Sequence, residues 1–186
     1  AEILFRNTER VLEHMDSLGM PFEVIVGSNG STDHTVSVLN RMRGEESRIR
    51  YFHMEKKGVG AAFKQGVQMA AYPHMVTVDI DLSIDLNFIQ EANRLLNRYH
   101  IVIGSKVTGD QRRPYIRKAA SNLFIRLAGF LLQIEFQDYS IGAKGYHTEV
   151  VKRYLNRIDQ KTFYVVEIIY RACRDGFRIA EVPVAC

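Results

Sequence analysis

The 186-residue sequence has few cysteines and no long apolar run. Its two cysteines, Cys173 and Cys186, have no metal-ligand spacing and form no disulfide framework, which fits a reducing compartment. The six histidines are scattered without a ligand pair at i and i+4, so we expect no zinc site. No uncharged apolar run approaches the roughly 20 residues of a membrane-spanning helix, so the sequence predicts no integral membrane segment.

The sequence also has no internal repeat, low-complexity tract or linker, which predicts one domain over residues 1–186. A composition of 46% hydrophobic and 25% charged residues suits a globular domain with a sizeable core. The net charge of +4 favours anionic partners such as nucleotides, phospholipid head groups or nucleic acid. Nucleic acid is the least favoured of these and is not expected as a partner, because no interleaved aromatic and basic pattern accompanies the charge.

Segments of helix and strand character alternate through residues 4–104, with short loops between them. This order predicts an α/β fold with a doubly wound, mostly parallel sheet flanked by helices. Further along the chain, a basic loop at 109–118 precedes a predicted helix at 119–134. The expected strands are 22–26, 49–53, 75–78, 101–104, 143–146 and 178–182, and the expected helices are 4–18, 36–42, 61–71, 85–99, 150–155 and 163–172.

Two carboxylates, Asp79 and Asp81, follow the buried strand at 75–78. Ligands bind at the carboxyl ends of strands in open α/β sheets, and two acids at i and i+2 can converge on one divalent cation. Mg²⁺ or Mn²⁺ held by one or two carboxylates and substrate phosphates is a common arrangement. The alternative is that both are solvated loop acids and that Asp85 caps the next helix.

Glycines mark two further turns. Residues 27–33 form a polar, glycine-rich turn after the strand at 22–26, and Asp33 or Thr35 can cap the following helix. We expect this strand to lie in the same sheet as Asp79 and to end at the same edge. Gly58 and Gly60 precede the helix at 61–71, whose first N–H groups could receive a phosphate. The alternative for these glycines is an ordinary turn at a helix start.

Taken together, the motifs resemble an inverting glycosyltransferase of family 2 with the GT-A fold, and most closely its polyprenyl-phosphate, dolichyl-phosphate mannose synthase-like branch. The resemblance covers nearly the whole chain. In the first half of the chain, V-I-V-G-S-N-G-S-T-D at 24–33 resembles the family's strand followed by D-D-G-S-T-D, K-G-V-G-A-A at 57–62 resembles its K-G-x-G-x-A, and D-I-D at 79–81 resembles its D-x-D. In the second half, G-S-K at 104–106 resembles its G-S-R, and residues 138–142 resemble its D-x-x-x-G. Glu167 and E-V-P-V at 181–184 resemble its late E and E-V-P-V signatures.

The resemblance implies transfer of a sugar from a nucleotide-diphosphate sugar. It implies Mg²⁺ or Mn²⁺ bound by Asp81, with Asp79 in support. Ser28 and Asn29 stand where the family has paired acids, so contacts with the base would be neutral hydrogen bonds, and Lys106 replaces an arginine. The nucleotide-sugar-binding residues implied are Ser28, Asn29, Asp33, Lys57, Gly58, Asp79 and Lys106.

A polyprenyl phosphate is the expected acceptor, with Arg117, Ser121 and Lys144 binding it and with Asp138 and Arg117 as the catalytic residues. The basic residues of 112–118 precede a helix, 119–134, with one broad apolar face, which is typical of an interfacial helix with a basic rim. We therefore expect a cytoplasmic protein, peripheral at the cytoplasmic face of a membrane. The alternative for this segment is a core helix covering the sheet.

Three alternatives remain open for the site itself. The acceptor could be a saccharide or another hydroxyl compound, with Asp138 as general base, or Asp138 could be a buried capping acid. The chain could be a non-catalytic nucleotide-binding module of the same fold, as Ser28 and Asn29 suggest. Glu167 could pair with Arg171 one helical turn away.

The resemblance also bears on the ends of the domain. The family's first strand is expected before Ala1 and a basic segment after the E-V-P-V stretch. Residues 1–186 are therefore expected to form a single glycosyltransferase catalytic domain that lacks its first strand and its C-terminal segment.

Overall fold

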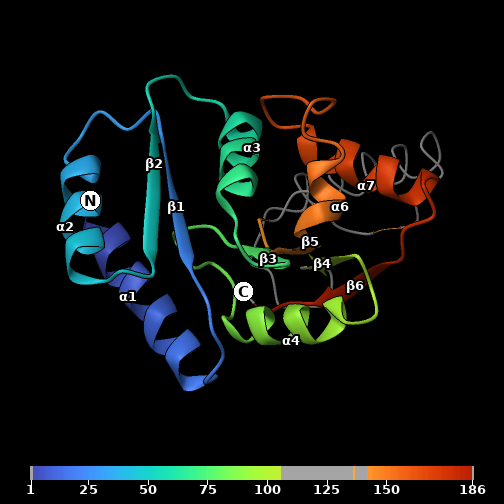
Figure 1. The fold of residues 1–186 in the computed structure, drawn as a ribbon, viewed down its shortest axis with the longest axis horizontal. Coiled ribbons are helices and arrows are strands. Elements are labelled where there is room, and N and C mark those ends of the chain that lie inside the picture. The colour runs from blue at the N-terminus through green and yellow to red at the C-terminus, as the bar shows by residue number, and fades with distance from the viewer. Residues whose placement is uncertain (1, 106–135, 137–141, 186) are drawn as a thin grey trace, which may run out of the picture.

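A computed structural model of the chain describes residues 2–105, 136 and 142–185 (Figure 1). Helices and strands alternate as the sequence predicts. The elements before residue 106 are α1 (Glu2–Ser17), β1 (Val24–Asn29), α2 (Thr35–Glu45), β2 (Ile49–Met54), α3 (Val59–Met69), β3 (His74–Thr77), α4 (Asn87–Leu96) and β4 (Ile101–Ser105). Those after residue 141 are β5 (Lys144–His147), α6 (Thr148–Lys152), α7 (Tyr164–Arg174) and β6 (Ile179–Pro183).

The strands form two sheets with parallel pairs in both, flanked by helices, which confirms the predicted α/β class. One sheet contains β1 and β2, which are parallel. The other has the strand order β3-β5-β4-β6, in which β4 and β6 are parallel and β5 is antiparallel to both β3 and β4. The expectation that β1 shares a sheet with β3 is wrong among the described strands, because each belongs to a different sheet.

The end of β1 also differs from the expected turn. Backbone pairing with β2 continues to the pair Asn29 and Met54, so Gly27 and Ser28 are strand residues. A glycine at 27 suits this place, because a Cβ there would come within 2.6 Å of the Phe52 ring. The turn itself begins at Gly30, which has a φ of 71° that non-glycine residues rarely adopt.

The core of the larger sheet is centred on β4. Ile101, Val102 and Ile103 are all 0% exposed. Since successive side chains of a strand point to opposite faces, Ile101 and Ile103 pack into one cluster with α6 and α7, whereas Val102 packs with α4 on the other face. Figure 1 shows this layering, with α4 below the sheet and α6 and α7 above it.

Helix α1 connects the two sheets. The Nδ2 group of Asn7 donates a hydrogen bond of 2.7 Å to the carbonyl oxygen of Ile80, just beyond β3. A second hydrogen bond joins the two sheets without α1. Glu23, the residue before β1, accepts it at 2.6 Å from the N–H of Ala71, which precedes β3. No helix among the described residues is both long and apolar enough to cross a bilayer.

Candidate functional site

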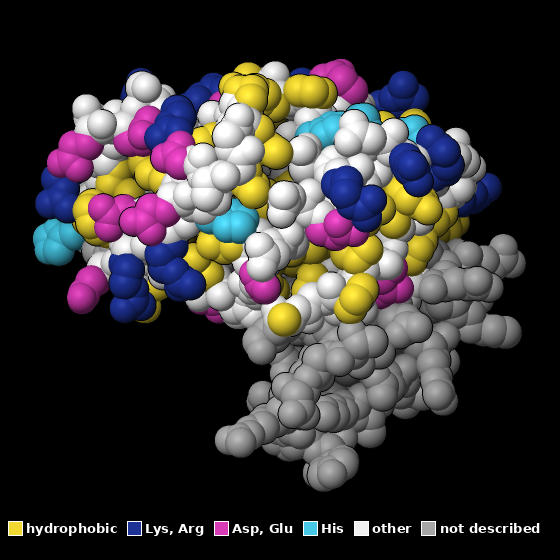
Figure 2. All heavy atoms as spheres, turned by 90° about the horizontal axis from the view of Figure 1, so that it is seen from below, with side chains coloured by type: hydrophobic (Ala, Val, Ile, Leu, Met, Phe, Trp, Pro, Cys, Tyr) yellow, Lys and Arg dark blue, Asp and Glu magenta, His cyan; other side chains and the backbone are white. Residues whose placement is uncertain are grey.

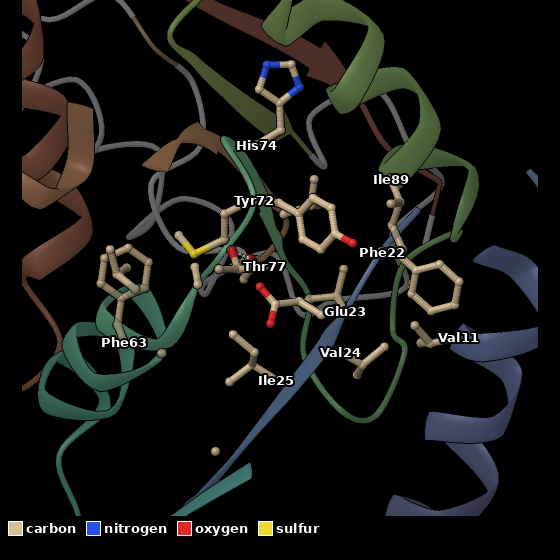
Figure 3. Close-up of a pocket in the computed structure, with 18 of the residues that line it drawn as sticks. Val11, Phe22, Glu23, Val24, Ile25, Phe63, Tyr72, His74, Thr77 and Ile89 are labelled. Atoms are coloured by element: carbon tan, nitrogen blue, oxygen red, sulfur yellow. Dashed lines mark hydrogen bonds between the residues drawn. The ribbon is translucent and has the colours of Figure 1, made fainter. Parts of the chain in front are cut away.

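A cavity of about 600 Å³ lies between β1 and β3. Its walls are mostly apolar side chains, with Val24 and Ile25 from β1 and Phe63 from α3 (Figure 3). Asp79, Gly142 and Tyr164 also line it. The cavity therefore joins a largely apolar cleft between two strands to the first of the two aspartates.

The two aspartates lie in a tight turn after β3. The N–H of Leu82 donates to the carbonyl oxygen of Asp79 at 2.9 Å, and Leu82 has a φ of 47°, which is unusual for a leucine. Both aspartates are exposed. The Oδ1 atom of Asp81 accepts a hydrogen bond of 3.0 Å from the N–H of Ser83, and its Oδ2 atom lies outside that bond.

These two carboxylates are suitable ligands for Mg²⁺ or Mn²⁺. Within the described ranges, no group of three His, Cys, Asp or Glu side chains could hold a metal by itself. A cation at Asp79 and Asp81 would thus need further oxygen ligands from phosphates or water, which is how Mg²⁺ is usually bound. The donor set fits a cation that arrives with a phosphate-containing substrate.

The side chains at the end of β1 make hydrogen bonds within the protein. Ser28 is only 2% exposed, and its hydroxyl shares a hydrogen bond of 3.0 Å with Nδ1 of His53. Asn29 accepts a hydrogen bond of 2.7 Å from the N–H of Gly58, which connects β1 to the start of α3. These two side chains are therefore engaged in holding β1, β2 and α3 together.

Asp33 is hydrogen-bonded to the first residue of α2. Its carboxylate accepts hydrogen bonds from the hydroxyl and the N–H of Thr35, at 2.6 and 3.1 Å, and these lower the pKa of Asp33 to about 2. The expectation that Asp33 or Thr35 is the cap of this helix is wrong, because the N-cap residue is His34, without a side-chain cap bond, and Asp33 precedes it. Asp33 is exposed and ionised at neutral pH.

Gly60, the second residue of α3, packs against the loop at 159–161. The N–H groups of Gly60 and Ala61 donate to the carbonyl oxygens of Lys161 and Gln160, at 2.8 and 3.0 Å. The expectation that these groups receive a phosphate is therefore wrong, because they already have partners. A Cβ on Gly60 would overlap the carbonyl oxygen of Asp159, so the close approach of this loop explains the glycine.

The remaining predicted residues are only partly described. Lys57 is exposed beside Gly30, whereas Lys144 lies within β5 and is 1% exposed. The others, namely Lys106, Arg117, Ser121 and Asp138, lie outside the described residues, as do the basic cluster at 112–118 and the predicted helix 119–134. On the molecular face of Figure 2, the described Lys and Arg side chains are interspersed with Asp and Glu and do not gather into one basic stripe.

The sequence interpretation missed Tyr164. This residue begins α7, and its ring lies 4.7 Å from that of Phe63. Burial, followed by the negative charge of Asp79, raises the pKa of Tyr164 to about 12, so the phenol is protonated at neutral pH. Its place within an apolar helical stripe gave no signal of a site residue.

Glu167 has a different partner from the one expected. Its Oε2 atom accepts a hydrogen bond of 2.6 Å from the N–H of Asp159, and Arg171 donates to the carbonyl oxygen of Arg157 instead. The proposed pair of Glu167 and Arg171 is therefore wrong. Glu167 holds the loop that packs on Gly60.

The model of the protein family described as "Glycosyl transferase family 2" matches residues 2–155. The chain belongs to this family. It is 31% identical over 188 residues to "Glycosyltransferase AglD" of Haloferax volcanii, covering 96% of this chain and 30% of that protein. It is 28% identical over 178 residues to "Dolichyl-phosphate hexose transferase" of the same organism, covering 94% of this chain and 74% of the relative. The second name agrees with the polyprenyl-phosphate branch that the motifs resemble.

Solved structures confirm the GT-A fold. Glucosyl-3-phosphoglycerate synthase from Mycobacterium tuberculosis, in complex with Mn²⁺, uridine diphosphate and glucosyl-3-phosphoglycerate, superposes with a TM-score of 0.62 at 14% sequence identity. The match covers 88% of this chain and 59% of that one. This chain thus spans only part of the length of the proteins that it matches.

Proposed function

We propose that this chain provides the donor site of an inverting, metal-dependent glycosyltransferase that transfers a sugar from a nucleotide-diphosphate sugar to a polyprenyl phosphate. The observation that carries this proposal is the pair Asp79 and Asp81, exposed at the end of β3 beside a cavity, in a chain of glycosyl transferase family 2. The complex of the Mycobacterium synthase with Mn²⁺ and uridine diphosphate supports the choice of cation and leaving group.

A divalent cation supplies neutralisation of the negative charge that develops on the departing diphosphate. Asp81 is the principal ligand, because its Oδ2 atom lies outside the hydrogen bond with Ser83. Asp79 would support the cation from the side of the cavity, either nearer to the ribose or without touching the cation directly. The neutral groups of Ser28 and Asn29, together with Asp33, Lys57, Gly58 and Lys106, are the proposed contacts of the nucleotide.

The acceptor determines which protein groups the reaction needs. The phosphate oxygen attacks the anomeric carbon from behind, and the bond from this carbon to the diphosphate oxygen breaks with its electron pair. A lipid phosphate is already anionic near neutral pH and needs mainly positioning, whereas an alcohol needs a general base. Arg117 and Ser121 hold the acceptor phosphate, and Asp138 lines the acceptor side. Lys144 is not kept in this role, because it lies within β5 and is only 1% exposed. The name of the dolichyl-phosphate hexose transferase supports this acceptor class.

Titration calorimetry with uridine and guanosine diphosphate, with and without Mn²⁺, tests the donor site. Asp81→Asn should lose the Mn²⁺-dependent part of nucleotide binding and keep its thermal stability. Asp85→Asn is a matched control, because Asp85 is an exposed acid of the same loop that accepts the N–H of Asn87. If Asp81→Asn binds with unchanged Mn²⁺ dependence, the assignment of the cation ligand is wrong.

Kinetics of the whole enzyme on polyprenyl phosphate and on a sugar alcohol test the acceptor. With a phosphate acceptor, Arg117→Ala should raise the acceptor KM or lower turnover sharply, while Asp138→Asn keeps measurable activity. With an alcohol acceptor, Asp138→Asn should cost the general-base contribution of about 10²–10⁴-fold. Transfer to the alcohol alone would exclude the lipid acceptor, and nucleotide binding without any transfer would favour a non-catalytic module.

Flotation with anionic liposomes tests the location at a membrane surface. The basic segment 112–118 followed by the apolar face of 119–134 should bind such liposomes at low salt and release them at high salt. Absence of binding at low salt would favour a core position for the helix.

A further inference from the structure

Gly142 lies directly against the carboxylate of Asp79. A Cβ built on Gly142 would come within 2.6 Å of Cγ and 2.5 Å of Oδ1 of Asp79. Real Cβ atoms essentially never approach other heavy atoms so closely. Any other residue at position 142 would therefore require the carboxylate or the backbone of residue 142 to move.

The backbone at Gly142 is held from two sides. The hydroxyl of Thr77, the last residue of β3, donates a hydrogen bond of 2.6 Å to the carbonyl oxygen of Gly142. The next residue, Ala143, accepts a hydrogen bond of 3.0 Å from the N–H of Gly104 in β4. Because these bonds attach the segment to β3 and β4, a side chain at position 142 would displace the carboxylate of Asp79 in preference to the backbone.

Tyr164 is a second residue on the side of the cavity where Asp79 lies. It lines the same cavity as Asp79 and Gly142 and comes from α7, an element remote from both in the sequence. Its ring is fixed by Phe63, whose own ring also packs at 5.6 Å against that of Tyr146.

We propose that Gly142 and Tyr164 are positioning residues that set the direction of the Asp79 carboxylate for the donor nucleotide and its cation. This inference rests on the proposed function, because it gives the site of Asp79 its geometry. Gly142 acts by steric contact, and Tyr164 acts from α7 through the cavity that it lines together with Asp79. Groups that orient metal-binding carboxylates typically change metal affinity by about 10–100-fold when they are altered.

Gly142→Ala is the sharper test, with Gly145→Ala as its control. A Cβ on Gly145 would be tight as well, at 3.0 Å from Cβ of Ala92, but it contacts α4 and not Asp79. Both variants should lose some stability. Only Gly142→Ala should weaken Mn²⁺-dependent binding of uridine or guanosine diphosphate, by about 10–100-fold, while binding without Mn²⁺ stays the same.

Tyr164→Phe tests the hydroxyl and keeps the ring on Phe63. Its control is Tyr154→Phe, which also removes one tyrosine hydroxyl. The hydroxyl of Tyr154 donates to Asp175 at 2.7 Å, and Tyr154 does not line the cavity. Tyr164→Phe should weaken Mn²⁺-dependent binding about 10-fold, and Tyr154→Phe should not.

A double-mutant cycle separates positioning from a general packing effect. Once Asp79→Ala has removed the carboxylate, Gly142→Ala should cause no further loss of Mn²⁺-dependent binding, since coupled residues are not additive. Additive losses, or wild-type binding by Gly142→Ala and Tyr164→Phe, would overturn the positioning roles alone. Absence of Mn²⁺-dependent nucleotide binding in the wild-type chain would overturn both these roles and the proposed function.

Discussion

Replacement of Gly60 by alanine sets two physical effects of opposite sign against each other. Gly60 is the second residue of α3, where glycine costs about 0.8–1 kcal/mol relative to alanine by helix propensity. Propensity alone therefore predicts that Gly60→Ala stabilises the protein. The structure predicts the reverse, because the new Cβ would overlap the carbonyl oxygen of Asp159 and approach C of Gln160 to 2.9 Å.

The contact should outweigh the propensity. To admit a methyl group, the loop 159–161 must move away from α3, which puts at risk the two hydrogen bonds from Gly60 and Ala61 to that loop. Each is worth about 1 kcal/mol net, and forced overpacking costs about 1–3 kcal/mol. After subtraction of the gain in propensity, we expect a loss of about 2–4 kcal/mol in the free energy of unfolding.

Urea unfolding of the whole chain, followed by circular dichroism, measures this difference. Gly66→Ala is the matched control in the same helix, because its nearest neighbour would be a Phe52 ring carbon at an ordinary 3.8 Å. Gly66→Ala should raise the free energy of unfolding by up to about 1 kcal/mol. If Gly60→Ala stabilises as much as Gly66→Ala, the packing explanation of Gly60 is refuted.

Two further predictions concern the pH dependence of stability and the support of the aspartate turn. The pKa of His100 is lowered, first by burial and then by His147 and Arg178, so the unfolded state binds more protons than the folded state. The free energy of unfolding should therefore fall as the pH drops below about 6.5. His100→Gln should flatten this dependence in unfolding curves measured at pH 5–8. Asn7→Ala removes the side-chain bond to Ile80 and should cost about 1–2 kcal/mol, with faster amide exchange in the Asp79–Leu82 turn; unchanged exchange would mean that α1 does not support this turn.

The alternation of strands and helices could be predicted from the sequence, because short β-branched runs such as residues 75–78 and helical apolar spacing are local signals. The exposed pair Asp79 and Asp81 was predicted for the same reason, since both acids directly follow a buried strand. The direction of β5 was not predictable, because an antiparallel strand between two others depends on pairing with β3 and β4 and not on its own composition.

Residues that act by proximity were beyond local reasoning. The sequence marks Gly142 only as the last residue of the D-x-x-x-G stretch and gives no pattern for Tyr164, and neither signal reveals that these residues lie beside Asp79 in the folded chain. Gly60 shows the opposite error. The pattern of Gly58 and Gly60 indicates a phosphate-binding turn, but the N–H of Gly60 donates to a loop about 100 residues away, and sequence cannot reveal that contact.

The cleft between β1 and β3 explains why the expected common sheet was wrong in detail. The two strands belong to different sheets, yet both border the same cavity, and α1 bridges them through Asn7. Side chains from β1 and α3 that line the cavity are apolar, as Figure 3 shows for Val24, Ile25 and Phe63. The two sheets therefore meet at this cavity, where Asp79 lies within reach of a ligand that also contacts side chains of β1.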